Sequence, residues 1–217
     1  EHFNNPGITQ NDGFKPVVRY FDRIIRPEQI ISSLQQAIQV MLDPADCGPA
    51  CISLCQDVQG EVFDYPEEFF KERIHTIRRP KPDDFQIKES AELIKKSKKP
   101  IIISGGGVFY SDATDELSAF AIKHNIPVTQ TVMGYSSMKK DHSHYLGTIG
   151  GLGGRAANNL SKETDTAIAI GTKLADFTTG SWSNFENPDF KLVSINAARF
   201  DANRHMAQAI VGDAKVS

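Results

Sequence analysis

Several features that would narrow the function of a 217-residue chain are missing from this sequence. No apolar run approaches the ~20 residues of a membrane-spanning helix, and no secretory signal pattern opens the chain. The net charge of −3 removes any strong attraction to nucleic acids or anionic membranes. These absences predict a globular protein of the cytoplasm that binds neither nucleic acid nor membrane.

Cysteine is also scarce. The chain has three, Cys47, Cys51 and Cys55, and this low, odd count argues against a disulfide framework. Their regular spacing would suit a metal or iron–sulfur centre, but no histidine or fourth cysteine lies nearby in the sequence. The segment "ACISLC" is typical of a short buried strand that places Cys51 and Cys55 on one face, with Cys47 in the turn before it. We therefore predict core cysteines and no metal site.

The N-terminal part of the chain has few structural signals. It has no initiator Met, and residues 1–26 are polar with turn-forming Pro6-Gly7 and Asp12-Gly13, which predicts mostly loop. From Pro27, apolar residues recur at helical spacing until Asp43-Pro44 stops the run. We expect this to be a piece of a longer chain.

Residues 64–86 combine four prolines with many charges, which predicts a linker. After it, helical patterns alternate with apolar strands. The predicted strands are "IIIS", "IPVTQTV", "TAIAIGT", "FKLVSIN" and "AQAIVGD". Near-continuous apolar strands separated by helices indicate a parallel sheet covered on both faces. Residues 87–217 are thus predicted to form an α/β, Rossmann-like domain.

A triple glycine follows the first of these strands, in "IIISGGGVFYSD". The dinucleotide fingerprint G-x-G-x-x-G requires a third glycine, and Tyr110 stands in its place. The next strand ends in Gln130 and Thr131 rather than in the acidic residue that would hold a ribose. These departures argue against NAD. Further glycines at strand ends predict a groove lined by backbone: Gly134, Gly150, Gly151, Gly153, Gly171 and Gly212.

Histidines occur close together in "KDHSHYL", where His142 and His144 could present two imidazoles to a metal. No further ligands cluster around them, so we predict a solvated loop. No Ser–His–Asp set stands out, and "GGGVF" is not a nucleophile elbow. The residues by themselves predict no reaction.

The order of several segments resembles the thiamine-diphosphate-dependent enzymes. "GPACISLCQDVQ" is similar to the closing strand of their pyrimidine-binding domain. The segments that resemble their central domain are "IIISGGG", "IPVTQTVMGYSSM", "HYLGTIGGLGG", "AIAIGTKLADFTTG", "SINA" and "IVGDAK". The resemblance implies that residues 1–63 are the C-terminal part of a pyrimidine-binding domain, 64–86 a linker and 87–217 the central domain.

Three more segments resemble one branch of this family, which opens a cyclic dione in inositol catabolism. They are "NDGFKPVVRYFDRIIRPEQI", "DYPEEFF" and "DFTTGSW". The resemblance implies a parent hydrolase that uses thiamine diphosphate and Mg²⁺, cleaves a C–C bond and yields the open-chain acid 5-deoxy-glucuronate. It also implies a homo-oligomer that includes further N- and C-terminal domains.

In this family, the glutamate that activates the cofactor lies earlier in the pyrimidine-binding domain, and the segment that holds Mg²⁺ and diphosphate lies in a third domain. We therefore expect these 217 residues to be an inactive structural or dimerising part that binds no cofactor by itself.

In some relatives the central-domain groove holds FAD or ADP. The resemblance carries over a set of groove residues: Gly105, Gly106, Gly107, Thr131, Gly134, Gly153 and Gly171. The flavoprotein pattern has Asp-Asp-Arg where this chain has Ala175-Asp176-Phe177, and Ile-Asp where it has Ile195-Asn196. The arginine and the carboxylate that would hold phosphate and ribose are thus lost, so we predict a remnant groove.

We further hypothesise that Tyr135, Ser136, Ser137 and the 150–154 loop lie near the substrate entrance of the parent enzyme. Two alternatives stay open on the sequence. One is an acetolactate synthase-like or oxalyl-CoA decarboxylase-like central domain that binds FAD or ADP. The other is a non-catalytic nucleotide-binding module.

Overall fold

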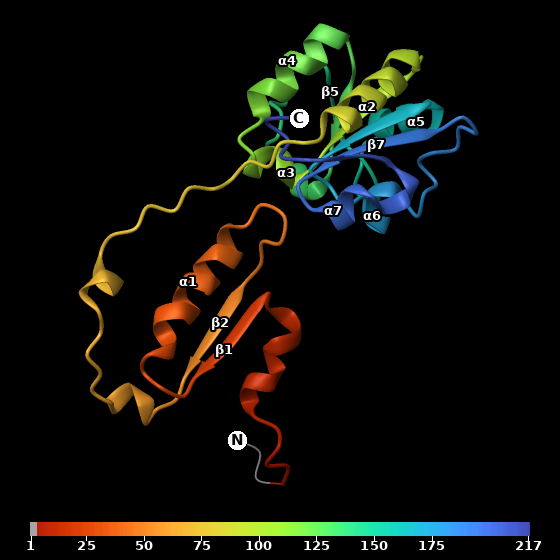
Figure 1. Ribbon diagram of the computed structural model, residues 1–217. Coiled ribbons are helices and arrows are strands. Elements are labelled where there is room, and N and C mark those ends of the chain that lie inside the picture. Colours follow the sequence, from red (N-terminus) through yellow and green to blue (C-terminus); the bar gives the residue numbers. More distant parts are fainter. Residues whose placement is uncertain (1–3) are drawn as a thin grey trace. The chain divides into compact units, whose positions relative to one another are not determined.

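The computed structural model describes residues 4–217, which form two compact units, Glu1–Arg78 and Arg79–Ser217 (Figure 1). The division between the units falls inside residues 64–86, the stretch predicted as a linker. Each unit contains a parallel sheet of its own.

The first unit is a two-stranded parallel sheet with one helix. Strand β1 (Tyr20–Ile24) pairs with β2 (Ala50–Leu54), and α1 (Gln29–Leu42) connects them. Four short 3-10 helices complete it: Gln10–Gly13, Lys15–Val17, Val58–Gly60 and Glu67–Phe70. The prediction of loop for residues 1–26 is wrong at β1. A five-residue strand with Asp22 and Arg23 at its centre shows no apolar alternation, and it forms through pairing with β2 and a hydrogen bond that Ser33 on α1 donates to Asp22.

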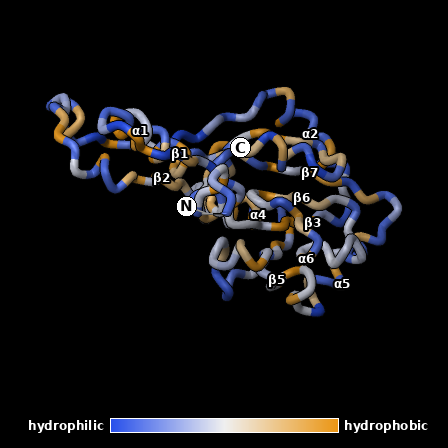
Figure 2. Tube along the Cα trace, turned by 90° about the horizontal axis from the view of Figure 1, so that it is seen from below, coloured by the Kyte–Doolittle hydropathy of each residue, from blue (hydrophilic) through white to orange (hydrophobic). Residues whose placement is uncertain are grey.

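Helix α1 forms as its spacing of apolar residues predicts. Along it, hydrophobic residues recur among hydrophilic ones (Figure 2). At its start, the Gln29 side chain accepts hydrogen bonds from the N–H groups of Ile25 and Arg26, at 2.8 and 2.9 Å. At its end, Asp43 turns to an extended conformation before Pro44, and its side chain accepts from the next turn. The ends are therefore set by local hydrogen bonds.

The cysteines lie in this unit as free thiols. Cys47 is exposed, and Cys51 and Cys55 are half-buried. The prediction that Cys51 and Cys55 are core residues is thus not met within this unit, because a two-stranded sheet with one covering helix buries little. The Cys55 sulfur accepts a hydrogen bond from Arg23 Nε at 3.2 Å.

The second unit is a six-stranded parallel sheet in the order β5-β4-β3-β6-β7-β8, flanked by helices. Its strands are β3 (Pro100–Ser104), β4 (Val128–Gln130), β5 (Tyr145–Thr148), β6 (Thr166–Ile170), β7 (Lys191–Asn196) and β8 (Gln208–Val211). Its α-helices are α2 (Asp84–Lys96), α3 (Gly106–Tyr110), α4 (Thr114–His124), α5 (Arg155–Glu163), α6 (Asp176–Thr179) and α7 (Arg199–Ala202). Two 3-10 helices are Val132–Gly134 and Arg204–Met206. The predicted α/β fold with a parallel sheet is confirmed, and β5 is an additional strand that was not predicted from the sequence.

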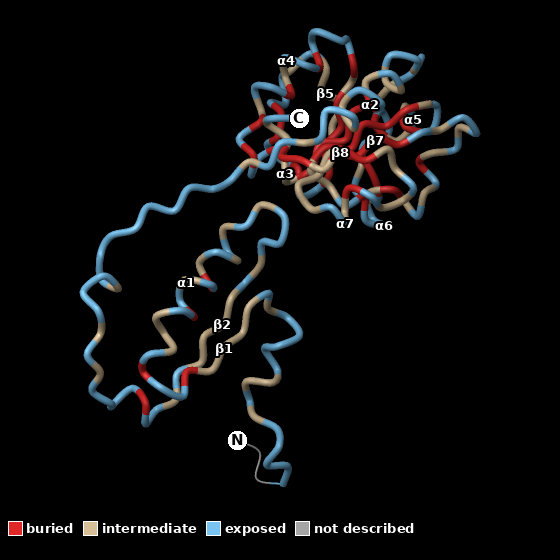
Figure 3. Tube along the Cα trace, viewed as in Figure 1, coloured by how far each residue is buried: buried red, intermediate tan, exposed pale blue. Residues whose placement is uncertain are grey.

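The core has two layers, one on each face of the sheet (Figure 3). One face packs Ile102 and Ile168 against Leu117 and Ala121 of α4. The other packs residues such as Ile101 against α5. Since alternate residues of β3 and β6 point to opposite faces, both faces need apolar side chains. This explains the unbroken apolar runs "IIIS" and "AIAI".

Candidate functional site

The strand order reverses direction at the centre of the sheet. The chain moves outward one way from β3 through β4 to β5, and the other way from β6 through β7 to β8. In open parallel sheets the crevice beyond the carboxyl ends of the two central strands is where ligands bind. Here those two strands, β3 and β6, end directly before Gly105 and Gly171. Two of the glycines predicted to line a groove, Gly105 and Gly171, therefore lie at the switch point of the sheet.

The glycines at this point are in contact with one another. A Cβ on Gly107 would lie 2.5 Å from the Gly171 Cα, and a Cβ on Gly105 would lie 2.3 Å from the Gly171 oxygen. Gly107 N–H also donates to the Gly171 oxygen at 2.9 Å, and Gly171 has a left-handed φ of +60°. These three glycines allow two backbone turns to touch, so their first role is structural.

Gly134 and Thr131 fix the turn after β4. A Cβ on Gly134 would lie 2.2 Å from the oxygen of Ser104, so only glycine fits there. Thr131 is buried, and its hydroxyl accepts a hydrogen bond from Gly134 N–H at 2.9 Å. A Cβ on Gly106 would lie 3.0 Å from the oxygen of Met133, which belongs to the same turn. Thr131 thus acts as a helix cap, with its hydroxyl turned to the backbone.

The loop after β5 closes on itself through Gly153 and Gly150. A Cβ on Gly153 would lie 2.7 Å from the Gly150 nitrogen, and Gly150 has a φ of +97°. Asn158 of α5 clamps this turn, because its side chain accepts from Gly150 N–H at 2.9 Å and donates to Gly150 O at 3.1 Å. Asn158 was not among the residues predicted from the sequence, since a polar residue inside a helix carries no special signal.

The predicted entrance residues differ in exposure. Tyr135 and Ser136 are exposed, and Ser136 has a left-handed φ of +75°. Ser137 is fully buried: its hydroxyl lies 2.6 Å from that of Ser104 and accepts from Gln130 Nε2 at 3.2 Å. Ser137 therefore anchors the turn to the sheet, whereas Tyr135 and Ser136 are free to face solvent.

Two polar side chains at or just after the carboxyl ends of β6 and β7, Lys173 and Asn196, make local contacts. Lys173 lies 3.7 Å from Asp201 in an ion pair, just after β6. The Asn196 side chain, at the end of β7, is used locally: it donates to the Thr172 oxygen at 3.4 Å and accepts from Ala198 N–H at 3.0 Å. Both hydrogen bonds of the Asn196 side chain are therefore made to the neighbouring backbone.

The two histidines of "KDHSHYL" lie in the loop before β5, as predicted. His142 Nε2 pairs with Ser118 Oγ at 2.9 Å, and His144 Nε2 pairs with Asn125 Oδ1 at 3.0 Å. Across residues 4–217, no group of three or more His, Cys, Asp or Glu side chains is arranged to hold a metal ion. In the same range, no helix has the length and apolar character needed to cross a membrane.

Comparison with known proteins agrees with this fold. Residues 87–217 match the family described as thiamine pyrophosphate enzyme, central domain. The chain is 48% identical over 216 residues to the 3D-(3,5/4)-trihydroxycyclohexane-1,2-dione hydrolase of Clostridium perfringens, covering 100% of this chain and 34% of the relative. It is 50% identical to the protein of the same name from Clostridium botulinum, covering 99% of this chain and 33% of the relative. The chain thus spans about a third of the length of these curated relatives.

A solved structure shows the same fold at low sequence identity. The benzoylformate decarboxylase from Polynucleobacter necessarius superposes with a TM-score of 0.76 at 21% identity, over 98% of this chain and 40% of that protein. At this identity the likeness concerns the fold alone. Taken with the match of residues 87–217, the chain belongs to the thiamine pyrophosphate enzyme family and contains its central domain.

Proposed function

We propose that this chain is part of a thiamine diphosphate-dependent hydrolase that opens the ring of trihydroxycyclohexane-1,2-dione by C–C cleavage. The observation that carries the proposal is the 48% identity, over the whole of this chain, to a relative bearing that name. The reaction would convert the cyclic dione to 5-deoxy-glucuronate in inositol catabolism. The cofactor, when bound, would supply the carbanion chemistry, and the protein would position it.

The described residues would contribute structure rather than chemistry. The glycines at the switch point hold two turns in contact, and the described residues do not gather ligands for Mg²⁺. In this proposal the cofactor and Mg²⁺ are held by other domains of a homo-oligomeric enzyme of the cytoplasm. The chain alone would be a structural or dimerising part without activity.

Within the complete enzyme, Tyr135 and Ser136 would lie beside the substrate entrance. Their exposure at the carboxyl edge of β4 supports this assignment, since ligands of parallel sheets approach that edge. Ser137 would act indirectly, through its hydrogen bonds to Ser104 and Gln130. Replacing Tyr135 by Ala in the complete enzyme should raise KM or lower kcat, and unchanged kinetics would remove Tyr135 from the entrance.

The test is turnover of the cyclic dione by the full-length enzyme with thiamine diphosphate and Mg²⁺, with this chain assayed in parallel. Turnover by the full-length enzyme and none by the chain is the expected result. Turnover of pyruvate or an acyl-CoA in place of the dione would overturn the substrate assignment and leave the family unchanged. Activity of the chain alone would overturn the structural role proposed for it.

A further inference from the structure

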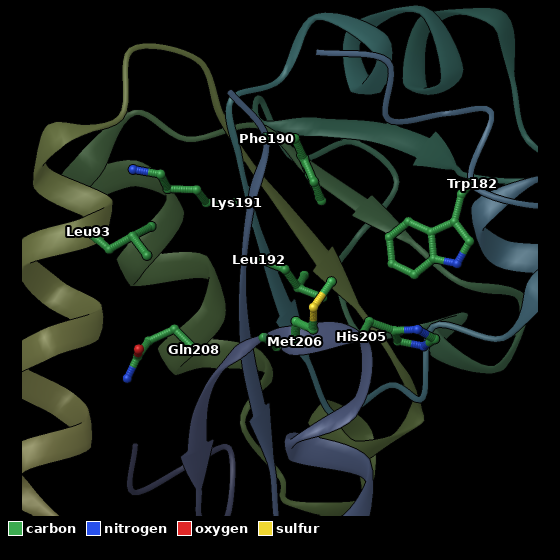
Figure 4. A pocket seen from close by; sticks show the side chains of 9 residues that line it. Leu93, Trp182, Phe190, Lys191, Leu192, His205, Met206 and Gln208 are labelled. Atoms are coloured by element: carbon green, nitrogen blue, oxygen red, sulfur yellow. The ribbon is translucent and has the colours of Figure 1, made fainter. Parts of the chain in front are cut away.

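A second hollow lies at the opposite edge of the sheet from the glycine turns. Strands β7 and β8 begin at Lys191 and Gln208, and a cavity of ≈ 630 Å³ opens beside these amino ends. Its lining residues are Leu93, Trp182, Phe190, Lys191, Leu192, His205, Met206, Ala207 and Gln208. Figure 4 shows Leu93, Lys191 and Gln208 on one side and Trp182 and His205 on the other. The walls are mainly apolar, with three polar groups among them.

One of these polar groups has no partner. His205 Nε2 is buried without a hydrogen bond, and the only other side-chain atom of this kind among residues 4–217 is Ser90 Oγ. The His205 ring meets the Trp182 ring edge-on, with centroids 4.7 Å apart, but a ring contact is a weak substitute for a hydrogen bond. Because buried polar atoms in native proteins are nearly always paired, an unpaired one indicates a missing ligand or water.

The backbone around the cavity is strained. Ser181, Trp182, His205 and Met206 all have left-handed φ values, of 53°, 67°, 59° and 55°. This conformation is unfavourable for a non-glycine residue, and such residues cluster where a ligand or a mechanism requires them. In this conformation the rings of Trp182 and His205 are in edge-on contact, and the Met206 side chain is fully exposed. Residues in an unfavourable backbone conformation therefore form part of the cavity wall.

The charge of the cavity favours an anion. Lys191 is exposed and, in the part of the chain that the structure describes, has no carboxylate within the 4.0 Å of an ion pair. No Asp or Glu side chain lines the cavity. Glu89, which is not among the lining residues, accepts a hydrogen bond from Gln208 Nε2 at 3.1 Å. A lysine without an ion-pair partner beside an apolar wall favours a ligand that has both a negative charge and a hydrophobic body.

We propose that this cavity binds a small carboxylate with an aromatic or branched apolar body. The body would lie against Trp182, Phe190 and Leu192. A carboxylate oxygen would accept the hydrogen bond that His205 Nε2 lacks, and Lys191 would favour the negative charge from the rim. A polyhydroxylated ring such as the cyclic dione would leave its hydroxyls unpaired against these walls, so the cavity does not suit that ring.

The experiment uses the single tryptophan of the chain. Trp182 is the sole Trp in the sequence, so its fluorescence reports directly on this cavity. The intact 217-residue chain is titrated with 3-phenylpropanoate, and with 3-phenylpropanamide as a neutral probe of the same shape. We expect a saturable change in fluorescence with the carboxylate, and binding of the amide that is weaker by several-fold.

Three variants separate a built site from a general affinity for anions. His205→Phe keeps a ring of similar size and removes the nitrogen, and should weaken the carboxylate at least tenfold, the loss expected for a hydrogen bond to a charged group. Lys191→Met should weaken it about threefold and reduce the preference over the amide, as for an exposed charge contact. Lys123→Met, on α4 away from this cavity, is the matched control and should change nothing.

A fourth variant covers the case in which His205→Phe fails to fold. Met206→Gly removes an exposed side chain from the cavity and suits its left-handed φ, so the chain should stay folded and bind the carboxylate at least as tightly. Absence of saturable binding in both the wild type and Met206→Gly overturns the proposal. Binding that is equally strong in Lys191→Met and Lys123→Met, and indifferent to carboxylate or amide, also overturns it.

Discussion

Both units of this chain contain a parallel sheet and helices, but they differ greatly in how much apolar surface they bury. In Glu1–Arg78, a two-stranded parallel sheet and α1 leave most side chains exposed or half-buried, and Ile24, Ala37 and Val58 are the buried hydrophobic residues among residues 4–78. In Arg79–Ser217, six strands covered on both faces bury two apolar clusters. Two strands and a helix cannot cover their own apolar surface, whereas a doubly covered sheet can. The first unit therefore buries little apolar surface by itself, whereas the second unit contains a core of its own.

The largest effect is expected when the two units are produced separately and their folding is compared. Residues 79–217 should unfold cooperatively and show dispersed amide signals by NMR, because their core is complete. Residues 1–78 alone should show neither, since an isolated small sheet is marginal in water. Cooperative unfolding of the 1–78 piece would contradict the comparison, and so would failure of the 79–217 piece to fold.

The next test concerns the backbone contact between the glycine turns that follow β3 and β6 in the second unit. Gly107→Ala places a methyl group 2.5 Å from the Gly171 Cα, where neither backbone can move freely. We expect a loss of roughly 3 kcal/mol in the free energy of unfolding, measured with urea. The matched control, Gly13→Ala in the first unit, has no atom within 4 Å of its new methyl and should leave this transition unchanged. A loss below about 1 kcal/mol at Gly107 would show that the turns can separate.

The difference between the units also decides which parts of the structure could be predicted from the sequence. The parallel sheet of residues 87–217 was predictable, because buried strands such as "TAIAI" are continuous apolar runs between helices. Strand β1 was not, because it forms through its pairing with β2 and a hydrogen bond from α1. The half-buried state of Cys51 and Cys55 was not either, because it depends on how little of the small sheet α1 covers. The glycines at the switch point were predictable as residues of a groove, but their contact with one another is a property of the folded backbone.

The predicted site shows the same limit. Thr131 and Ser137 are polar residues at a strand end, and the sequence makes them candidates for ligand contact. In the structure both turn inward, Thr131 to cap a turn and Ser137 to bond Ser104. Asn158 carries no pattern in the sequence and still clamps the 150–154 loop. The direction of a side chain is set by tertiary packing, which a pattern of residue types does not contain.

A smaller effect is expected at Asp165, which ties the start of β3 to the start of β6. Burial opposes ionisation of this carboxyl, but hydrogen bonds from Ser97 Oγ and from the N–H groups of Lys98 and Lys99 outweigh it, so its pKa lies below the usual value. A lowered folded-state pKa stabilises the fold above the unfolded-state pKa of 3.8, and this stability is lost as the pH falls through the folded value.

Asp165→Ala should therefore cost about 2 kcal/mol at pH 7, the loss of hydrogen bonds to a charged group. The difference from the wild type should shrink as the pH falls below about 4, which urea denaturation at several pH values measures. Asp141→Ala, in an exposed loop, is the control with little change. A difference that stays constant down to about pH 2 would mean that the charge of Asp165 contributes nothing.

The smallest expected effect asks whether the carboxyl edge of the well-packed unit is strained. Ser136 is exposed with a φ of +75°, a conformation that costs a non-glycine residue about 1 kcal/mol. Ser136→Gly should therefore raise the free energy of unfolding by about 0.5 kcal/mol, once the greater freedom of glycine in the unfolded chain is subtracted. Ser143→Gly, at an exposed residue outside the left-handed region, should lower it, because there glycine brings that freedom and also removes the hydrogen bond between Ser143 Oγ and His144 Nδ1, at 3.0 Å. Equal changes in the free energy of unfolding at the two positions would show that the left-handed backbone of Ser136 costs the fold nothing.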